Sequence, residues 1–212
     1  MAHTYIRQAE KMHGARLREE CRRIFSTAGI ASHDHLHHER VWENASQLLE
    51  RLYDAGMVTG SDMAEKAIIA AFFHDTGLTV NRGSDHGRES RRICGEFLNS
   101  LSMSNADCLE ILNAVEKHDD KAYTGQSDPS SLAAIISVAD DMDAFGETGI
   151  GRYGEIYSMR GIPASDMPGM IIENVISRFS HLESTYGIFP DLVDEMRVKA
   201  QTVISYFRDK TG

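Results

Sequence analysis

The sequence predicts an all-α protein, folded as a compact single-domain helical bundle. Apolar residues recur at spacings of three and four along most of the chain, and clear strand alternation is absent from the sequence. The chain has 212 residues, 42% of them hydrophobic and four of them proline, with no Ser-rich, Gly-rich or Pro-rich linker. That length supports one ordinary core, so we expect one domain over residues 1–212.

Eight segments show the spacing of amphipathic helices. We expect helices over residues 5–27, 33–54, 62–73, 86–101, 105–118, 130–145, 166–186 and 190–208. Turn and capping residues support some of these boundaries. Ser61 and Asp62 offer N-caps to the third segment, and Gly56 and Gly77 lie where helices should end.

Residues 146–169 differ from the rest of the chain. They include six glycines, alongside Arg152, Tyr153, Tyr157 and Arg160. Because glycine is unfavourable inside a helix, we expect a loop here that includes one helical turn at most and that could cover a site.

Charge and cysteine content exclude several classes of protein. The formal net charge of −10 disfavours a broad contact with long nucleic acid. A small phosphorylated substrate remains compatible, because a metal and a few basic residues can reverse the field within one cleft. Cys21, Cys94 and Cys108 form no C-x-x-C pair and predict reduced thiols. No apolar run could span a bilayer and the N-terminus lacks a signal-peptide pattern, so we expect a cytoplasmic protein with no membrane partner.

Three predicted helices carry an imidazole or a carboxylate where the apolar stripe would place Leu or Ile. His37 continues the core-facing stripe of the second segment. His74 follows a face of small alanines in the third segment, and Asp75 comes directly after it. Asp140 lies on the apolar stripe of the sixth segment, with Asp143 one turn later.

A buried acid without a partner costs several kcal/mol, so these positions predict a shared cation. Two histidines and two carboxylates suit a divalent ion such as Mn, Fe, Co, Ni or Zn. Mg is possible but binds imidazole less favourably. Four protein ligands leave positions open on an octahedral ion, where water and a phosphate oxygen could bind together. The arrangement is typical of a hydrolytic site.

The order of these residues resembles the HD superfamily of metal-dependent phosphohydrolases. Phe73-His74-Asp75-Thr76-Gly77 is similar to its eponymous motif, and the opening of the small stand-alone bacterial members, H-D-x-x-H-x-x-R-V, resembles the stretch from His33 to Val41. The segments from Ala139 to Gly146 and from Gly149 to Arg152 resemble A-D-x-x-D-A-x-G and G-I-x-R of that branch. The resemblance covers about residues 30–155, and we expect the helices of residues 156–212 to pack on that part.

The resemblance implies a helical bundle of the HD type, one divalent metal, and hydrolysis of a phosphoester or phosphoanhydride, often in nucleotides. It marks His37, His74, Asp75 and Asp140 as the metal ligands, and Asp75 as a residue that also orients the water. His33, His35 and His38 are interpreted as caps, hydrogen-bonding partners or exposed side chains, and Asp34 as an N-cap.

His86 and His118 form a second tier, because both end apolar stripes that could face the same cavity. In members that bind two metals, extra histidines occupy this interval of the chain. In single-metal members similar positions contact substrate phosphate. We favour the phosphate role, since the stretch from His86 to Ser90 resembles H-x-x-x-S of the small hydrolases, and we assign His86, His118 and Arg152 to the substrate phosphate.

Three functions remain open. The first is a phosphohydrolase acting on a nucleotide or a similar small phosphorylated metabolite, with Asp75, His86 and His118 as catalytic residues. The second is a di-iron oxygenase, which would need His86 and His118 as ligands of a second metal. The third is a non-catalytic sensor that binds a nucleotide in the HD pocket.

Overall fold

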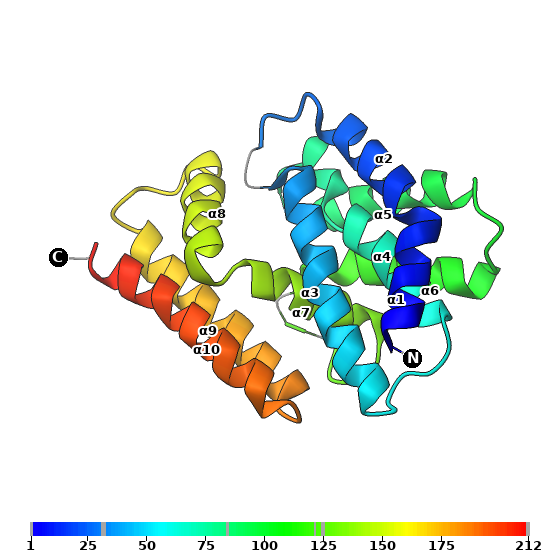
Figure 1. The fold of residues 1–212 in the computed structure, drawn as a ribbon. Helices are drawn as coiled ribbons and strands as arrows, with labels where there is room; N and C mark the ends of the chain where they lie inside the picture. The colour runs from blue at the N-terminus through cyan, green and yellow to red at the C-terminus, as the bar shows by residue number, and fades with distance from the viewer. Residues whose placement is uncertain (1, 31–32, 84, 121, 124–125, 211–212) are drawn as a thin grey trace. The chain divides into compact units, whose positions relative to one another are not determined.

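The computed structural model consists of helices joined by loops, and no strand occurs among the residues it describes, which are 2–30, 33–83, 85–120, 122–123 and 126–210 (Figure 1). The all-α prediction is confirmed. The chain forms two compact units, Met1–Ala139 and Asp140–Gly212. The prediction of a single domain, with the C-terminal helices packed on the core, stays a prediction.

The first unit begins with a helix that contains a π-helical turn. α1 (Ala2–Ala9), the π-helical turn (Glu10–Gly14) and α2 (Ala15–Phe25) follow one another without a break, where the sequence predicts one helix over residues 5–27. The indole of Trp42 donates to Glu10 at 2.5 Å, and His13 Nε2 lies 2.8 Å from Glu65 Oε1. These contacts join the π-helical turn to the helices over His35–Asp54 and Asp62–Phe73.

α3 (His35–Asp54) and α4 (Asp62–Phe73) pack against each other and form the centre of the first unit. Every residue of α4 from Lys66 to Phe73 is buried, as the alanine-rich sequence predicts. The carboxylate of Asp34 accepts from Leu36 N and His37 N and so caps α3. Beyond its other end, Gly56 takes the left-handed conformation, with φ of +69°. The prediction of a side-chain cap at Ser61 is wrong, because its hydroxyl makes no capping bond to α4.

A close backbone approach brings α5 (His86–Leu98) to the end of α4. Between them lies the 3₁₀ turn Thr76–Thr79, in which a Cβ on Gly77 would lie 1.9 Å from the carbonyl oxygen of His86. The Gly77 amide donates to Ser90 Oγ at 2.8 Å. Gly77 therefore lets the first turn of α5 reach the residues after α4. α6 (Asn105–Lys117), capped by Ser104, packs on α5 and α4.

α7 (Leu132–Asp143) begins in the first unit and continues as one helix into the second. Asn44 of α3 donates to the carbonyl of Ala139 at 3.0 Å, within the first unit. This bond fixes α7 on α3 at the residue before Asp140.

The second unit continues with α8 (Gly146–Met159), α9 (Met167–Tyr186) and α10 (Pro190–Arg208), of which α9 and α10 lie side by side (Figure 1). The prediction of a loop over residues 146–169 is wrong for its first part, because α8 is a helix of 14 residues. Gly149, Tyr153, Ile156 and Tyr157 share a buried face, and Gly151 and Gly154 have open space where a Cβ would stand. Burial of the aromatic face outweighs the low helix propensity of glycine. Across the described part of the chain, no helix has the length and apolarity to cross a bilayer.

Candidate metal centre

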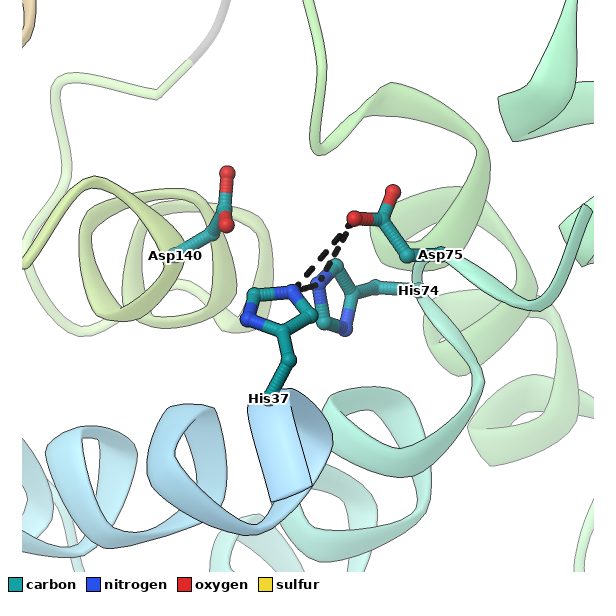
Figure 2. A group of neighbouring side chains, drawn as sticks. All are labelled: His37, His74, Asp75 and Asp140. Carbon is teal, nitrogen blue, oxygen red and sulfur yellow. Dashed lines mark hydrogen bonds and ion pairs between the residues drawn. The ribbon is translucent and has the colours of Figure 1, made fainter. Parts of the chain in front are cut away.

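The four predicted metal ligands lie close together (Figure 2). His37 stands in the first turn of α3, His74 is the C-cap of α4, Asp75 follows it, and Asp140 lies on α7. All four are buried, and each offers a ligand atom within 4.8 Å of the others.

Local hydrogen bonds orient the histidine rings. His74 Nδ1 donates to the carbonyl of Ala71 at 2.8 Å, so Nε2 is the nitrogen that remains for a ligand. The Nε2 atoms of His37 and His74 are 3.0 Å apart, and they lie 3.4 and 3.6 Å from Asp75 Oδ2. Two imidazole nitrogens and a carboxylate oxygen thus converge in a buried space, which is the donor set of a divalent transition metal.

The carboxylate of Asp75 is kept ionised. Burial alone would raise its pKa, but the charge of His74 and hydrogen bonds from His118, His37 and His86 hold the pKa well below its usual value. An ionised carboxylate with several nitrogen neighbours is the form that binds a metal.

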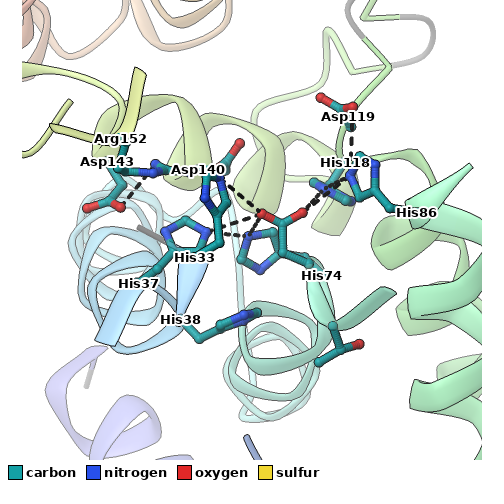
Figure 3. A network of polar contacts seen from close by, with 12 residues as sticks. His33, His37, His38, His74, His86, His118, Asp119, Asp140, Asp143 and Arg152 are labelled. Atoms are coloured by element: carbon teal, nitrogen blue, oxygen red, sulfur yellow. Dashed lines mark hydrogen bonds and ion pairs between the residues drawn. The ribbon is translucent and has the colours of Figure 1, made fainter. Parts of the chain in front are cut away.

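The other oxygen of Asp75 faces His86 and His118. Figure 3 shows these two histidines close together, beside Asp119. Oδ1 lies 2.9 Å from His118 Nε2 and 3.3 Å from His86 Nε2, and the two Nε2 atoms are 3.4 Å apart. These three residues form a second buried group that could hold a metal. The structure therefore places His86 and His118 beside Asp75, where their Nε2 atoms could contact a substrate phosphate or a second metal.

The environment of His86 favours the charged form of its ring. Burial alone would lower its pKa, but the hydrogen bond to Asp75 and the charges of Asp75 and Asp119 outweigh burial and raise the pKa to about 9. Asp119 Oδ2 lies 3.7 Å from His86 Nε2. Sequence reasoning missed Asp119, although it follows His118 directly in the third His-Asp dipeptide of the sequence.

The arginine predicted to bind phosphate contacts two carboxylates of its own unit. Arg152 Nη2 donates to Asp140 Oδ1 at 3.1 Å, and Nη1 donates to Asp143 Oδ2 at 3.0 Å. Arg178 of α9, which sequence reasoning missed, donates through Nη1 to Asp140 Oδ2 at 3.0 Å and to Asp141 Oδ1 at 2.6 Å. No motif marks Arg178, because its role depends on how α9 packs on α7.

Two of the histidines interpreted as caps, hydrogen-bonding partners or exposed side chains are buried, and one of them hydrogen-bonds a backbone carbonyl. His33 is buried, with Nε2 at 3.9 Å from Asp75 Oδ2. His38 is fully buried and its Nδ1 donates to the carbonyl of Ala71 at 3.1 Å. Burial, with the neighbouring charges of His74 and His37, holds the pKa of His38 well below its usual value, so this ring stays neutral.

A comparison with protein-family models identifies residues 36–144, about half of the chain, as an HD domain. The protein therefore belongs to the HD domain family, whose members are mostly metal-dependent phosphohydrolases. No curated protein and no solved structure matches the chain. HD domains bind divalent metals, and the buried histidine and aspartate cluster of this chain fits that chemistry.

Proposed function

We propose that this HD-domain protein is a metal-dependent phosphohydrolase that cleaves a phosphoester or phosphoanhydride bond in a nucleotide or another small phosphorylated metabolite. His37, His74, Asp75 and Asp140 would hold one divalent ion. The observation that carries the proposal is the convergence of the His37 and His74 Nε2 atoms on one oxygen of a buried, ionised Asp75.

When bound, a divalent ion supplies a Lewis acid that polarises a phosphoryl oxygen and lowers the pKa of water. Side chains of the protein would orient the water and bind the phosphate. Asp75 accepts hydrogen bonds through both oxygens and can orient a water molecule on either side. His86, whose pKa is about 9, carries a positive charge near neutral pH and can donate Nε2–H to a phosphate oxygen.

His118 would share the phosphate with His86, because the two Nε2 atoms are 3.4 Å apart and can reach neighbouring oxygens of one phosphate. Arg152 is also proposed as a phosphate ligand, in accordance with its motif. Its bonds to Asp140 and Asp143 support a role in holding Asp140 as well.

The experiment combines elemental analysis of gently purified protein with a metal-supplemented hydrolysis screen. Protein with added Mn, Co or Mg should release phosphate or pyrophosphate from at least one member of a broad nucleotide panel. Asp75→Ala should abolish the release, whereas His35→Ala, which changes a half-exposed ring outside the metal group, should preserve it. A panel with no metal-dependent turnover would contradict the proposal. Binding of a nucleotide without turnover would favour a sensor.

A second candidate is a di-iron oxygenase, and the observation that favours it is the group formed by Asp75, His86 and His118. Asp75 Oδ1 faces His86 and His118 while Oδ2 faces His37 and His74, so both groups of ligands would include Asp75. Metal counting separates the candidates. Two irons per chain with oxygen uptake would favour the oxygenase, and one exchangeable divalent ion with phosphate release would favour the hydrolase.

A further inference from the structure

Arg178 on α9 stands at the centre of a buried charge network in the second unit. Its Nη1 donates to Asp140 Oδ2 at 3.0 Å and to Asp141 Oδ1 at 2.6 Å, and its Nε donates to Asn174 Oδ1 at 2.9 Å. The same Asn174 oxygen accepts the hydroxyl of Tyr153 at 2.8 Å. Both Nε and Nη1 of Arg178 are therefore hydrogen-bonded, and Nη1 binds the carboxylates of two consecutive residues of α7.

The network controls the orientation of Asp140. Oδ1 accepts from Arg152 on α8 and Oδ2 accepts from Arg178 on α9, so the two oxygens of one carboxylate are bonded to two different helices. A terminal carboxylate torsion is otherwise broad. With both oxygens bonded, the plane of the Asp140 carboxylate is set by α8 and α9 before any ion arrives.

Charge balance also requires these arginines. Asp140, Asp141 and Asp143 are three buried carboxylates within four residues of α7. Arg152 and Arg178 supply two positive charges among them, and His181 Nδ1 contacts Asp141 Oδ2 at 3.1 Å. Removal of either arginine would leave the three buried acids with one guanidinium among them, and losing one partner of a buried ion pair is strongly destabilising.

We propose that Arg178 is a positioning residue for the metal centre: it fixes the Asp140 carboxylate in the orientation in which that residue binds the ion. This inference rests on the proposed metal role of Asp140. Arg178 acts through Asp140 and does not itself contact the ion or the substrate.

Whether removal of Arg178 weakens or strengthens metal binding distinguishes a positioning role from a purely electrostatic one. A guanidinium beside a metal ligand repels a cation, so if charge alone mattered, removal of Arg178 would tighten metal binding. If orientation matters more, removal weakens binding, because Asp140 then has to be ordered when the ion binds. Partners that orient metal ligands typically contribute a factor of about 10–100 in metal affinity.

Three variants test the inference by Mn²⁺ titration calorimetry and by the visible spectrum of the Co²⁺-loaded protein. Arg178→Met should weaken Mn²⁺ binding roughly 10-fold or more and change the Co²⁺ spectrum. Arg178→Lys keeps the charge but cannot hold two carboxylates and Asn174 at once, so it should recover only part of the affinity. Asn174→Ala keeps every charge and removes the acceptor that Arg178 Nε and the Tyr153 hydroxyl share, so it should also weaken Mn²⁺ binding, by a smaller factor than Arg178→Met.

Arg197→Met is the matched control. Arg197 lies on α10 and also pairs with two carboxylates, those of Glu183 and Asp194, but its side chain is 52% exposed and it has no bond to Asp140. Its removal should leave Mn²⁺ affinity unchanged. Circular dichroism confirms that each variant is folded. If Arg178→Met does not fold, Arg178→Lys and Asn174→Ala decide the question.

The outcomes are distinct. Wild-type protein that binds no metal would refute the proposed function itself. Wild-type protein that binds Mn²⁺, with folded Arg178 and Asn174 variants that bind it equally or more tightly, would leave the function standing and overturn the positioning role of Arg178.

Discussion

Asp75 and His118 are 43 positions apart in the sequence, yet His118 Nε2 lies 2.9 Å from Asp75 Oδ1. Asp75 lies just beyond the end of α4, and His118 lies at the end of α6. Their contact turns one oxygen of Asp75 away from His37 and His74. Asp75 is therefore the junction between the first group of candidate ligands and the second.

Replacement of His118 by Gln distinguishes the two roles considered for the second group. If His118 binds phosphate, kcat/KM should fall roughly 10–100-fold, which corresponds to the loss of one hydrogen bond to a charged group, and the metal content per chain should stay the same. The measurements are steady-state kinetics and elemental analysis of the same preparation. A loss of one metal ion per chain would instead assign His118 to a second metal.

The raised pKa of His86 predicts a pH-dependent stability of the metal-free protein. Its folded pKa of about 9 lies above the ordinary histidine value of 6.5, so the charged ring stabilises the fold. That contribution is fully present below pH 6.5 and is lost as the pH rises through 9. In EDTA, the stability difference between wild type and His86→Gln, measured by urea unfolding, should shrink over this interval. A difference that grows with pH would contradict the assignment.

Gly77→Ala should destabilise the protein and displace the start of α5. The added Cβ would lie 1.9 Å from the His86 carbonyl oxygen and 2.6 Å from Ser90 N, both backbone atoms that cannot move aside alone. Overpacking of this kind typically costs about 1–3 kcal/mol. Gly95→Ala is the control inside α5, where the new Cβ would meet only Leu112 at 3.8 Å, and it should stabilise by up to about 1 kcal/mol. Urea denaturation measures both changes.

The glycines of α8 should respond differently according to the face on which they lie. Gly151→Ala adds a Cβ in open space and should stabilise the helix by up to about 1 kcal/mol. Gly149→Ala would place its Cβ 2.0 Å from the Ala144 carbonyl oxygen and should destabilise. Thermal melts of the two variants check the assignment of residues 146–159 as a helix. Equal effects of the two substitutions would argue against it.

Most of the helices could be predicted from the sequence because each buries one face. Burial of one face places apolar residues at spacings of three and four, and this pattern is visible in the sequence. α8 could not, because its glycines suggested a loop while its buried aromatic residues, Tyr153 and Tyr157, occupy one helical face. The difference lies in tertiary packing, which supplies more free energy than the glycines lose.

The candidate ligands were predicted because they interrupt apolar stripes, and the structure brings His37, His74, Asp75 and Asp140 together. Their metal role stays a prediction. Arg178 and Asp119 were missed for a different reason. Each is an ordinary charged residue in sequence, and its partners become visible only when α9 reaches α7 and when the end of α6 reaches α5.

Three candidate site histidines share one local arrangement. His74, His86 and His118 each donate Nδ1–H to the carbonyl three residues earlier, that of Ala71, Gly83 and Val115. Because each acceptor is a backbone carbonyl, the residue that supplies it can carry any side chain. The orientation of each ring is therefore set within a stretch of four consecutive residues. Such a centre can keep its ring directions while the surrounding side chains diverge, so changes in the residues lining the site could alter substrate preference without rebuilding the histidines.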